Sequence, residues 1–155
     1  MILVIQRVKS AFVSIGGKEV SRIGKGLLVL GAVEKGDTQA ELQWCAKKVA
    51  DIRIFPDEED KMNRSVRDAG GEVLAVSQFT LVGNLKKGTR PSFSDAAPPE
   101  TAKPMFDNFV EMIEKEGLKV STGVFQAMMD VGLVNDGPVT IILRREPKEC
   151  PHAEG

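Results

Sequence analysis

The chain has 155 residues, a net charge of −1 and 42% hydrophobic residues, which is typical of one globular domain that buries its own core. A near-neutral charge gives no overall basic field for a nucleic acid, and 5% aromatic content argues against a base-stacking platform. Two cysteines form no disulfide framework and favour a reducing compartment. The apolar start, residues 1–5, is too short for a signal peptide or a membrane span.

The first third of the chain predicts a β-meander. Residues 1–9 have the pattern of a buried strand, and residues 11–15 and 18–23 predict a hairpin around Gly16-Gly17. The continuous apolar run at 27–33 is typical of a central strand.

Two helices are predicted from their start and stop signals. Thr38 and Glu41 match a capping box, and the helix that follows has Cys45 on its apolar face, which makes this cysteine a core residue rather than a nucleophile. Pro98-Pro99 introduces a second helix with a Met and Phe stripe, and Gly117 ends it.

The remaining segments complete the expected fold. Residues 52–54 alternate as in a strand, residues 72–81 predict a buried strand with a polar exit, and residues 118–134 have an extended pattern. About eight strands and two helices predict an α+β fold, a mostly antiparallel β-barrel or sandwich with two main helices packed on the sheet. We expect one domain over residues 1–145 and a disordered tail at 146–155.

A tight turn is predicted at Asn135-Asp136-Gly137-Pro138, between the apolar runs 128–134 and 139–143. One interpretation is an ordinary hairpin turn. The other is a rigid Gly-Pro unit that holds two backbone carbonyls in a fixed direction. The sequence leaves both interpretations open.

Several conventional catalytic chemistries are excluded. The only histidine, His152, lies in the tail, so a Ser-His-Asp or Cys-His arrangement and a zinc site with Cys150 are not expected. No P-loop or dinucleotide fingerprint occurs. We therefore expect no metal and no cofactor.

Two polar clusters remain besides the Gly-Pro turn. Ser77-Gln78-Phe79-Thr80 follows a buried strand, and its hydroxyl, amide and backbone N–H groups could stabilise an oxyanion or simply cap a neighbouring loop. Residues 86–90, Lys-Lys-Gly-Thr-Arg, could contact phosphates or form a solvated surface loop. Such a site could position a reactive substrate but could hardly activate an inert one.

Four stretches of the sequence become specific when they are taken together. They are Ser77-Gln78-Phe79-Thr80-Leu81, residues 87–93 (KGTRPSF), residues 122–129 (TGVFQAMM) and residues 135–140 (NDGPVT). Their order and separations resemble the D-aminoacyl-tRNA deacylase family, and the likeness extends over residues 1–145.

The resemblance implies a cytoplasmic homodimer that hydrolyses the ester between a D-amino acid and the terminal adenosine of tRNA. It implies that the Gly137-Pro138 bond is cis and that this pair enters the active site of the other subunit. Its carbonyls would bind the substrate α-amino group and leave no room for an L side chain. Glycine would be accepted, so glycine mischarged on alanine tRNA is an expected second substrate. The expected partner is aminoacyl-tRNA, with no DNA and no membrane.

The resemblance also implies residue roles. The terminal 2′-hydroxyl of the tRNA would assist catalysis, while Thr80 as nucleophile is the rival; with no base to activate it, an orienting role is favoured. The implied catalytic residues are Ser77, Gln78, Phe79 and Thr80, those near the amino acid or the adenine are Gly137, Pro138, Phe125, Ala127 and Met129, and those near phosphates are Lys86, Lys87 and Arg90.

Two other functions are compatible with the sequence. A non-catalytic module could bind tRNA ends or nucleotides through residues 86–90. A structural dimer could use the Gly-Pro turn only to lock an interface, in which case Gln78 and Thr80 would matter for stability alone.

Overall fold

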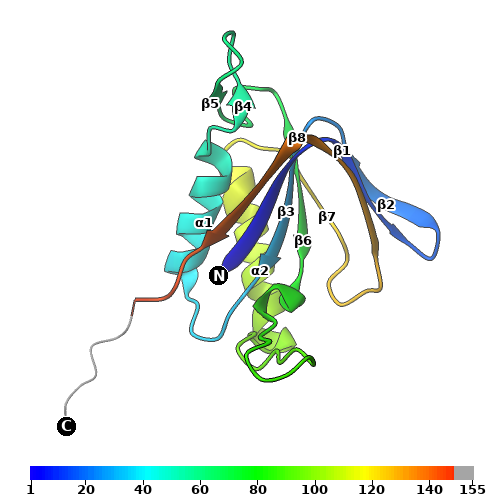
Figure 1. Cartoon of the computed structure of the whole chain (residues 1–155), viewed down its shortest axis with the longest axis vertical. Coiled ribbons are helices and arrows are strands. Elements are labelled where there is room, and N and C mark those ends of the chain that lie inside the picture. Colours follow the sequence, from blue (N-terminus) through cyan, green and yellow to red (C-terminus); the bar gives the residue numbers. More distant parts are fainter. Residues whose placement is uncertain (149–155) are drawn as a thin grey trace.

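The structure is a computed structural model and describes residues 1–148 (Figure 1). Residues 149–155 lie outside the described part, and with them Cys150, His152 and most of the predicted tail. In chain order the elements are β1 Ile2–Ile15, β2 Lys18–Ile23, β3 Gly26–Ala32, α1 Gln39–Asp51, β4 Phe55–Pro56, β5 Met62–Arg64, β6 Glu72–Ser77, a 3₁₀ turn Phe79–Val82, α2 Pro99–Lys115, β7 Val120–Thr122 and β8 Asp130–Arg144.

Six of the strands form one mixed sheet. Strand β1 pairs antiparallel with β2, β3 and β8, whereas β6 pairs parallel with β3 and with β7. The parallel pairs follow from the two helices, because each helix lies in a crossover that returns the chain to the same end of the sheet. The predicted α+β fold with two helices on the sheet is confirmed.

Strand β1 is the central element of the sheet. One of its edges pairs with β8 from Ile2 to Ser14, and the other pairs first with β3 and then with β2. Gly16 and Gly17 form the β1–β2 turn with φ of 57° and 79°, which confirms the predicted two-glycine hairpin.

Helices α1 and α2 lie side by side on one face of the sheet (Figure 1). The Thr38–Glu41 capping box starts α1 as predicted, and Cys45 is fully buried on its inner face. Burial raises the pKa of the Cys45 thiol to about 11, which confirms a core role rather than a nucleophilic one. Neither helix within residues 1–148 has the length and apolarity needed to cross a bilayer.

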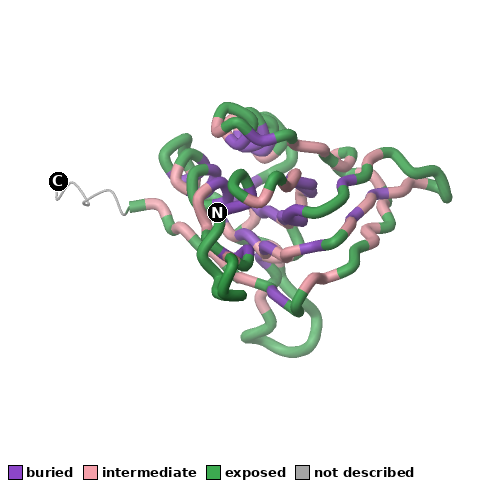
Figure 2. Tube along the Cα trace, turned by 90° about the horizontal axis from the view of Figure 1, so that it is seen from above, coloured by how far each residue is buried: buried purple, intermediate pink, exposed green. Residues whose placement is uncertain are grey.

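The opposite face of the sheet is only partly covered. Where β1 and β2 curl over, a second apolar cluster forms around Val8, Val13 and Leu28, with Leu74 and Val76 from β6. Figure 2 shows buried segments concentrated between the helices and the sheet, whereas much of β8 is intermediate or exposed.

Three local predictions were wrong. Residues 52–54 are not a strand, because Ile52 caps the C-terminus of α1 and strand pairing begins only at Phe55. The extended pattern at 118–134 is interrupted: β7 covers only Val120–Thr122, β8 begins at Asp130, and residues 123–129 between them form a loop in which Gln126 has a positive φ of 64°. The predicted strand at 72–81 ends at Ser77, where the 3₁₀ turn takes over.

The predicted turn at Asn135–Pro138 was also wrong, because it does not join two separate strands. Strand β8 runs through it and pairs with β1 on both sides, from Asn135 opposite Val8 to Thr140 opposite Gln6. Between these pairs, residues 136–139 stand opposite the single residue Arg7. Residues 136–139 are therefore a bulge within one long strand, and we call them the bulge.

Candidate active site

The polar residues Ser77, Gln78, Phe79 and Thr80 form the exit of β6, which we call the β6 exit. The Gln78 N–H donates to the Gly31 carbonyl at 2.8 Å, which ties the exit to the end of β3. The Gln78 side-chain amide donates to the Thr80 hydroxyl oxygen. Phe79 and Thr80 begin the 3₁₀ turn, so the bonds of the turn itself do not use their N–H groups. The β6 exit can therefore present two backbone donors and a hydroxyl to a ligand.

The chain continues from the β6 exit into the loop that the sequence predicted to be basic. Asn84 and Ser92 exchange two backbone hydrogen bonds, of 2.8 and 2.9 Å, which close the intervening residues 85–91 into a compact tip, the basic loop. Its cations, Lys86, Lys87 and Arg90, are exposed. Next to the basic loop, the Phe93 ring packs edge-on against Phe79 with centroids 5.2 Å apart. The loop therefore lies beside the β6 exit.

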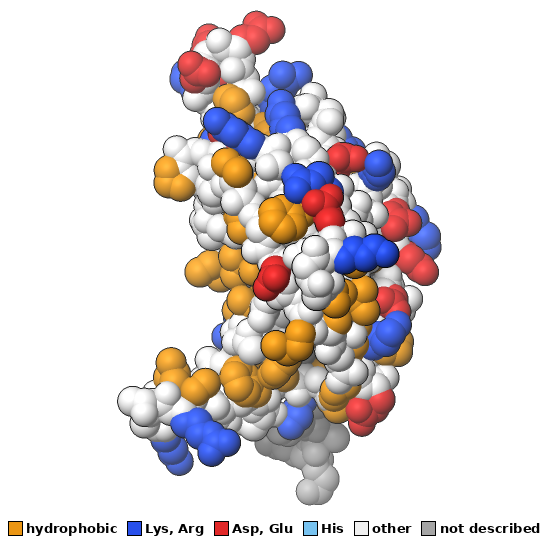
Figure 3. Space-filling view, turned by 90° about the vertical axis from the view of Figure 1, so that its right-hand side faces the viewer, with side chains coloured by type: hydrophobic (Ala, Val, Ile, Leu, Met, Phe, Trp, Pro, Cys, Tyr) orange, Lys and Arg blue, Asp and Glu red, His pale blue; other side chains and the backbone are white. Residues whose placement is uncertain are grey.

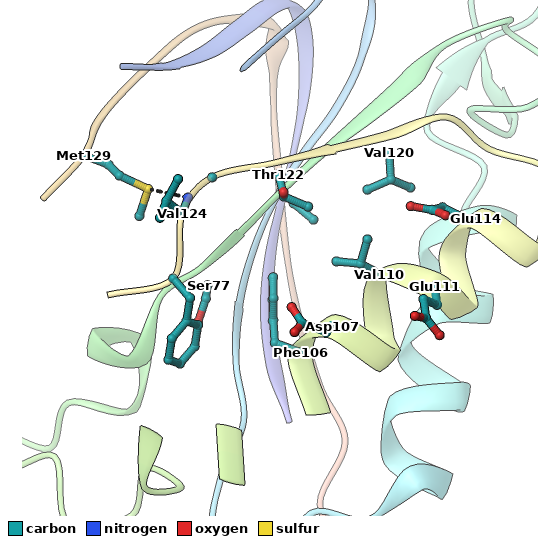
Figure 4. Close-up of a pocket in the computed structure, with 13 residues that line it drawn as sticks. Ser77, Phe106, Asp107, Val110, Glu111, Glu114, Val120, Thr122, Val124 and Met129 are labelled. Carbon is teal, nitrogen blue, oxygen red and sulfur yellow. Dashed lines mark hydrogen bonds between the residues drawn. The ribbon is translucent and has the colours of Figure 1, made fainter. Parts of the chain in front are cut away.

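A cavity of about 310 Å³ opens between the end of β6, β7, the loop 123–129 and α2 (Figure 4). Three residues of the predicted site line it: Ser77, Phe125 and Met129. The Met129 Sδ accepts a hydrogen bond from the Val124 N–H at 3.4 Å, which fixes the loop against the cavity. Ala127 does not line it, but its N–H donates to the Val124 carbonyl at 3.2 Å and so shapes the same loop.

The other wall of the cavity comes from α2 and was not predicted as part of a site. Asp107, Glu111 and Glu114 line this wall together with the apolar side chains of Phe106 and Val110 (Figure 4). The carboxylates recur at helical spacing, which is the signal that could have indicated a shared face. Asp107 pairs with Lys103 at 3.0 Å, but Glu111 and Glu114 repel phosphates, so this wall suits a neutral or amino-bearing group better than the RNA backbone.

Gly137 and Pro138 are exposed at the tip of the bulge and are joined by a cis peptide bond. Gly137 has a φ of +148°, and a Cβ there would lie 2.7 Å from the Val139 side chain and 2.9 Å from its nitrogen. The position therefore requires glycine.

Arg7 lies beneath the bulge on β1. Its Nε donates to the Asp136 carbonyl at 2.9 Å, and its Nη1 donates to the Ile54 carbonyl at 2.5 Å. Its side chain is 11% exposed, so the guanidinium is largely withdrawn from solvent. Sequence analysis missed Arg7, although an arginine inside an apolar strand was a signal for a specific partner.

Asn135 holds the neck of the bulge, where it leaves β8. Its Oδ1 accepts from the Val139 N–H at 2.7 Å, and its Nδ2 donates to the Val139 carbonyl at 3.1 Å. A further contact of 3.3 Å joins Nδ2 to the Thr140 hydroxyl. The bulge is thus held at both ends by side chains.

The predicted site residues form two separate groups in one chain. Ser77 of the β6 exit meets Phe125 and Met129 around the cavity, whereas Gly137 and Pro138 lie on β8 and do not line it. Between them the sheet leaves an apolar row uncovered, in which Val4 stands opposite both Leu30 and Ile142, the last 71% exposed. We call this row the uncovered face. Figure 3 shows apolar side chains along the hollowed side of the molecule.

Metal chemistry has no obvious place in residues 1–148, where no group of three or more His, Cys, Asp or Glu side chains is arranged to hold an ion. A histidine base is equally missing from this part of the chain, since His152 lies outside it. The arrangement can position a ligand and offer hydrogen bonds to it.

Comparisons with known proteins identify the family of the chain. The family model described as D-Tyr-tRNA(Tyr) deacylase matches residues 4–144. A protein of Pelobacter propionicus named D-aminoacyl-tRNA deacylase is 57% identical over 142 residues, which cover 92% of this chain and 98% of the relative. A protein of Chlorobaculum parvum with the same name is 53% identical over 146 residues, covering 94% and 98% of the two chains.

Two solved structures have the same fold. One, described as a c-Myc DNA Unwinding Element Binding Protein, has a TM-score of 0.89 and 41% identity and covers 94% of this chain and 99% of its own. The other, described as a probable eukaryotic D-amino acid tRNA deacylase, has a TM-score of 0.78 and 17% identity, covers 92% and 97% of the two chains, and supports the fold alone. The family match spans the β6 exit, the loop 123–129 and the bulge, and this chain belongs to the D-Tyr-tRNA(Tyr) deacylase family.

Proposed function

We propose that this protein hydrolyses the ester between a D-amino acid and the terminal adenosine of tRNA and spares the L ester. The observation that carries the proposal is the similarity of the chain, over more than nine-tenths of its length, to proteins named D-aminoacyl-tRNA deacylase. The activity would place the protein in the cytoplasm, where charged tRNA is used.

The chemistry requires little activation by the protein. An aminoacyl ester is reactive, so orienting a water molecule and stabilising the tetrahedral oxyanion suffice. The N–H groups of Phe79 and Thr80 supply donors for the oxyanion. Water adds to the carbonyl carbon and gives a proton to the neighbouring 2′-hydroxyl oxygen, which passes its own proton to the departing ribose oxygen as the bond between that oxygen and the carbonyl carbon breaks. The products are a free D-amino acid and uncharged tRNA.

Thr80 has an orienting role in this scheme. Its hydroxyl oxygen accepts a hydrogen bond from the Gln78 amide, which leaves the hydroxyl proton free to donate to the substrate. No base lies beside Thr80 in the described chain to make it a nucleophile. Ser77 would contact the adenosine end, because it lines the cavity together with Phe125 and Met129.

Selection for the D ester would come from a second copy of the chain. Ile142 of the uncovered face is 71% exposed, and Leu85 and Phe79, which follow β6 in the chain, are 59% and 57% exposed. Exposed apolar groups in such number mark protein interfaces. In a homodimer built on this face, the bulge of one subunit would reach the β6 exit of the other. Its carbonyls would bind the α-amino group and exclude an L side chain, while glycine, including glycine mischarged on alanine tRNA, would pass.

Binding of the RNA backbone would fall to the basic loop. Lys86, Lys87 and Arg90 are exposed and form no ion pair within residues 1–148. They follow the β6 exit closely in the chain. Phosphates of the acceptor end would therefore approach from the side of the basic loop.

The first test compares D-tyrosyl-tRNA with L-tyrosyl-tRNA. The purified protein should release the D ester and spare the L ester, and rates on several D-aminoacyl-tRNAs should be similar, because a backbone filter does not read the side chain. Hydrolysis of both esters would contradict the carbonyl filter, and hydrolysis of neither would contradict the proposed enzymatic activity.

The cross-subunit arrangement has its own test. Gly137→Ala and Thr80→Ala variants, each with reduced activity alone, are mixed, allowed to exchange subunits and assayed for activity above that of either variant. A shared site predicts that activity returns, because a mixed dimer pairs one intact β6 exit with one intact bulge. A site built within one chain predicts no recovery.

A binding module without chemistry is the second candidate, favoured by the basic loop and by the solved structure at 41% identity that is described as a DNA-binding protein. It predicts retention of tRNA or duplex DNA with no ester turnover. We propose that DNA is not a partner, so duplex DNA in excess should leave deacylation of tRNA unchanged.

A further inference from the structure

We propose that Asn135 is a positioning residue for the bulge, and that its side-chain amide sets how strictly L-aminoacyl esters are rejected. This inference rests on the proposed function, because it assigns the stringency of that function to a group outside the β6 exit and outside the Gly-Pro pair.

The amide of Asn135 replaces a missing strand partner. At residues 136–139 strand β1 offers only Arg7, so the Val139 backbone has no strand residue directly opposite. Asn135 supplies both bonds that a strand would supply, accepting from the Val139 N–H at 2.7 Å and donating to the Val139 carbonyl at 3.1 Å. At neutral pH the amide of Asn presents a donor and an acceptor on separate atoms, whereas the carboxylate of Asp, which has the same length, only accepts.

Two side chains hold the bulge like clamps, one at each end. Arg7 binds the Asp136 carbonyl at the entry, and Asn135 binds Val139 at the return. Within residues 1–148 the backbone of Gly137 and Pro138, between the clamps, receives no side-chain hydrogen bond. The direction of their carbonyls therefore depends on how firmly Asp136 and Val139 are held.

Loss of the amide should loosen the bulge without unfolding the sheet. Strand β8 pairs with β1 beyond both ends of the bulge, up to Arg144 and down to Asp130, and Val139 remains packed in the main core. A filter that discriminates by steric exclusion loses selectivity when its groups move by a fraction of an ångström. The effect should therefore appear in the ratio of D to L rates.

The experiment uses Asn135→Ala, Asn135→Asp and, as a matched control, Asn63→Ala. Asn63 also donates its amide to a loop, with Nδ2 3.3 Å from an Asp57 carboxylate oxygen, but on the β4–β5 hairpin. Single-turnover rates on D- and L-tyrosyl-tRNA are measured for the full chain, together with thermal unfolding. The D/L rate ratio should fall about tenfold or more in Asn135→Ala and stay unchanged in Asn63→Ala.

The Asn135→Asp variant separates positioning from structure. At neutral pH its carboxylate accepts from the Val139 N–H but faces the Val139 carbonyl with no proton to donate, so the ratio should be reduced. Lowering the pH protonates the introduced carboxyl, restores a donor and should raise the ratio toward that of the wild-type protein at the same pH. A wild-type ratio in Asn135→Ala, or D and L rates that fall in parallel with the melting temperature, would overturn the inference. If the wild-type protein itself fails to distinguish the esters, the proposed function fails first.

Discussion

The two faces of the sheet are formed by the same strands but are covered to different extents. On one face, Leu3 and Ile5 of β1 are fully buried beneath α1 and α2, in a core that includes Phe109 and Ile113. On the other face, Val4 lies between them in sequence and is only partly covered. Successive side chains of β1 therefore point alternately into the closed core and onto the uncovered face.

This difference separates stability from function. The helix-covered face is complete within one chain, whereas a single chain leaves uncovered the tip of the bulge at Gly137 and Pro138, part of the β6 exit and apolar groups of the second face. Substitutions on the first face should act on unfolding. Substitutions on the second should act on turnover or selectivity.

The largest effect is expected for Phe109→Ala. Phe109 is fully buried on α2 and packs against Phe106 at 5.7 Å between ring centroids, so truncation should destabilise the fold by about 3–5 kcal/mol. Urea unfolding measures this. Phe79→Ala is the matched variant on the other face, where the ring is 57% exposed; it should lose activity with little change in unfolding. Equal destabilisation by both would contradict the separation.

Gly137→Ala should have the next largest effect, on activity. A Cβ at φ +148° would meet Val139 at 2.7 Å, so the bulge must shift, and turnover of D-tyrosyl-tRNA should fall about a hundredfold, or roughly 2.7 kcal/mol. Gly16→Ala is the control, since it has a φ of +57° but open space around its Cβ position. It should cost about 1 kcal/mol of stability and leave turnover unchanged. Full activity in Gly137→Ala would argue against the bulge as part of the site.

Local signals accounted for most of the fold but not for the bulge. The capping box at Thr38, the two-glycine turn and the apolar stripe of α2 are each encoded within a few residues, and each was predicted. Asn, Asp, Gly and Pro together favour a hairpin turn by local chemistry. The structure keeps one strand instead, because β8 pairs with β1 on both sides of the bulge, and Arg7, over a hundred residues away in sequence, binds the Asp136 carbonyl.

The sequence predicted several of the site residues but not their arrangement in space. Ser77, Phe125 and Met129 were named from their motifs, and the cavity brings them together. Asp107 and its neighbours on α2 were missed, because helical spacing of carboxylates is also what a solvated helix face shows. No sequence pattern could place Gly137 away from that cavity, since this follows from the register of β8 on β1.

Thr80→Val tests the hydroxyl at the β6 exit and should have an intermediate effect. It keeps the shape and removes the donor, so the rate on the D ester should fall about tenfold, as expected for one lost hydrogen bond to developing charge. Substrate binding and thermal unfolding should change little, because Thr80 is exposed. A loss of stability without a loss of rate would favour the structural-dimer interpretation. A decrease of more than a thousandfold in the rate on the D ester would instead support Thr80 as the nucleophile.

Thr38→Ala should affect stability alone, by about 1 kcal/mol. The Thr38 hydroxyl, 2.6 Å from Glu41 Oε2, lowers the pKa of this carboxyl below its ordinary value. Because the folded pKa is lowered, the stabilisation is present above the pKa of the unfolded chain and is lost as the pH falls through the folded pKa. The stability difference between wild type and Thr38→Ala should therefore shrink in acid. A difference that stays constant with pH would contradict the link to Glu41.

The smallest effect is expected at the basic loop. Lys87→Gln removes one exposed charge beside the β6 exit, so KM for aminoacyl-tRNA should rise about two- to threefold at low salt while kcat stays unchanged, because the phosphate contact is equal in ground and transition states. The slope of log KM against log salt should fall by about 0.7–0.9 for one lost contact. Lys18→Gln, an exposed charge at the start of β2, is the control. If both variants raise KM alike, binding of the RNA depends only on the net charge of the protein, and the basic loop makes no specific phosphate contact.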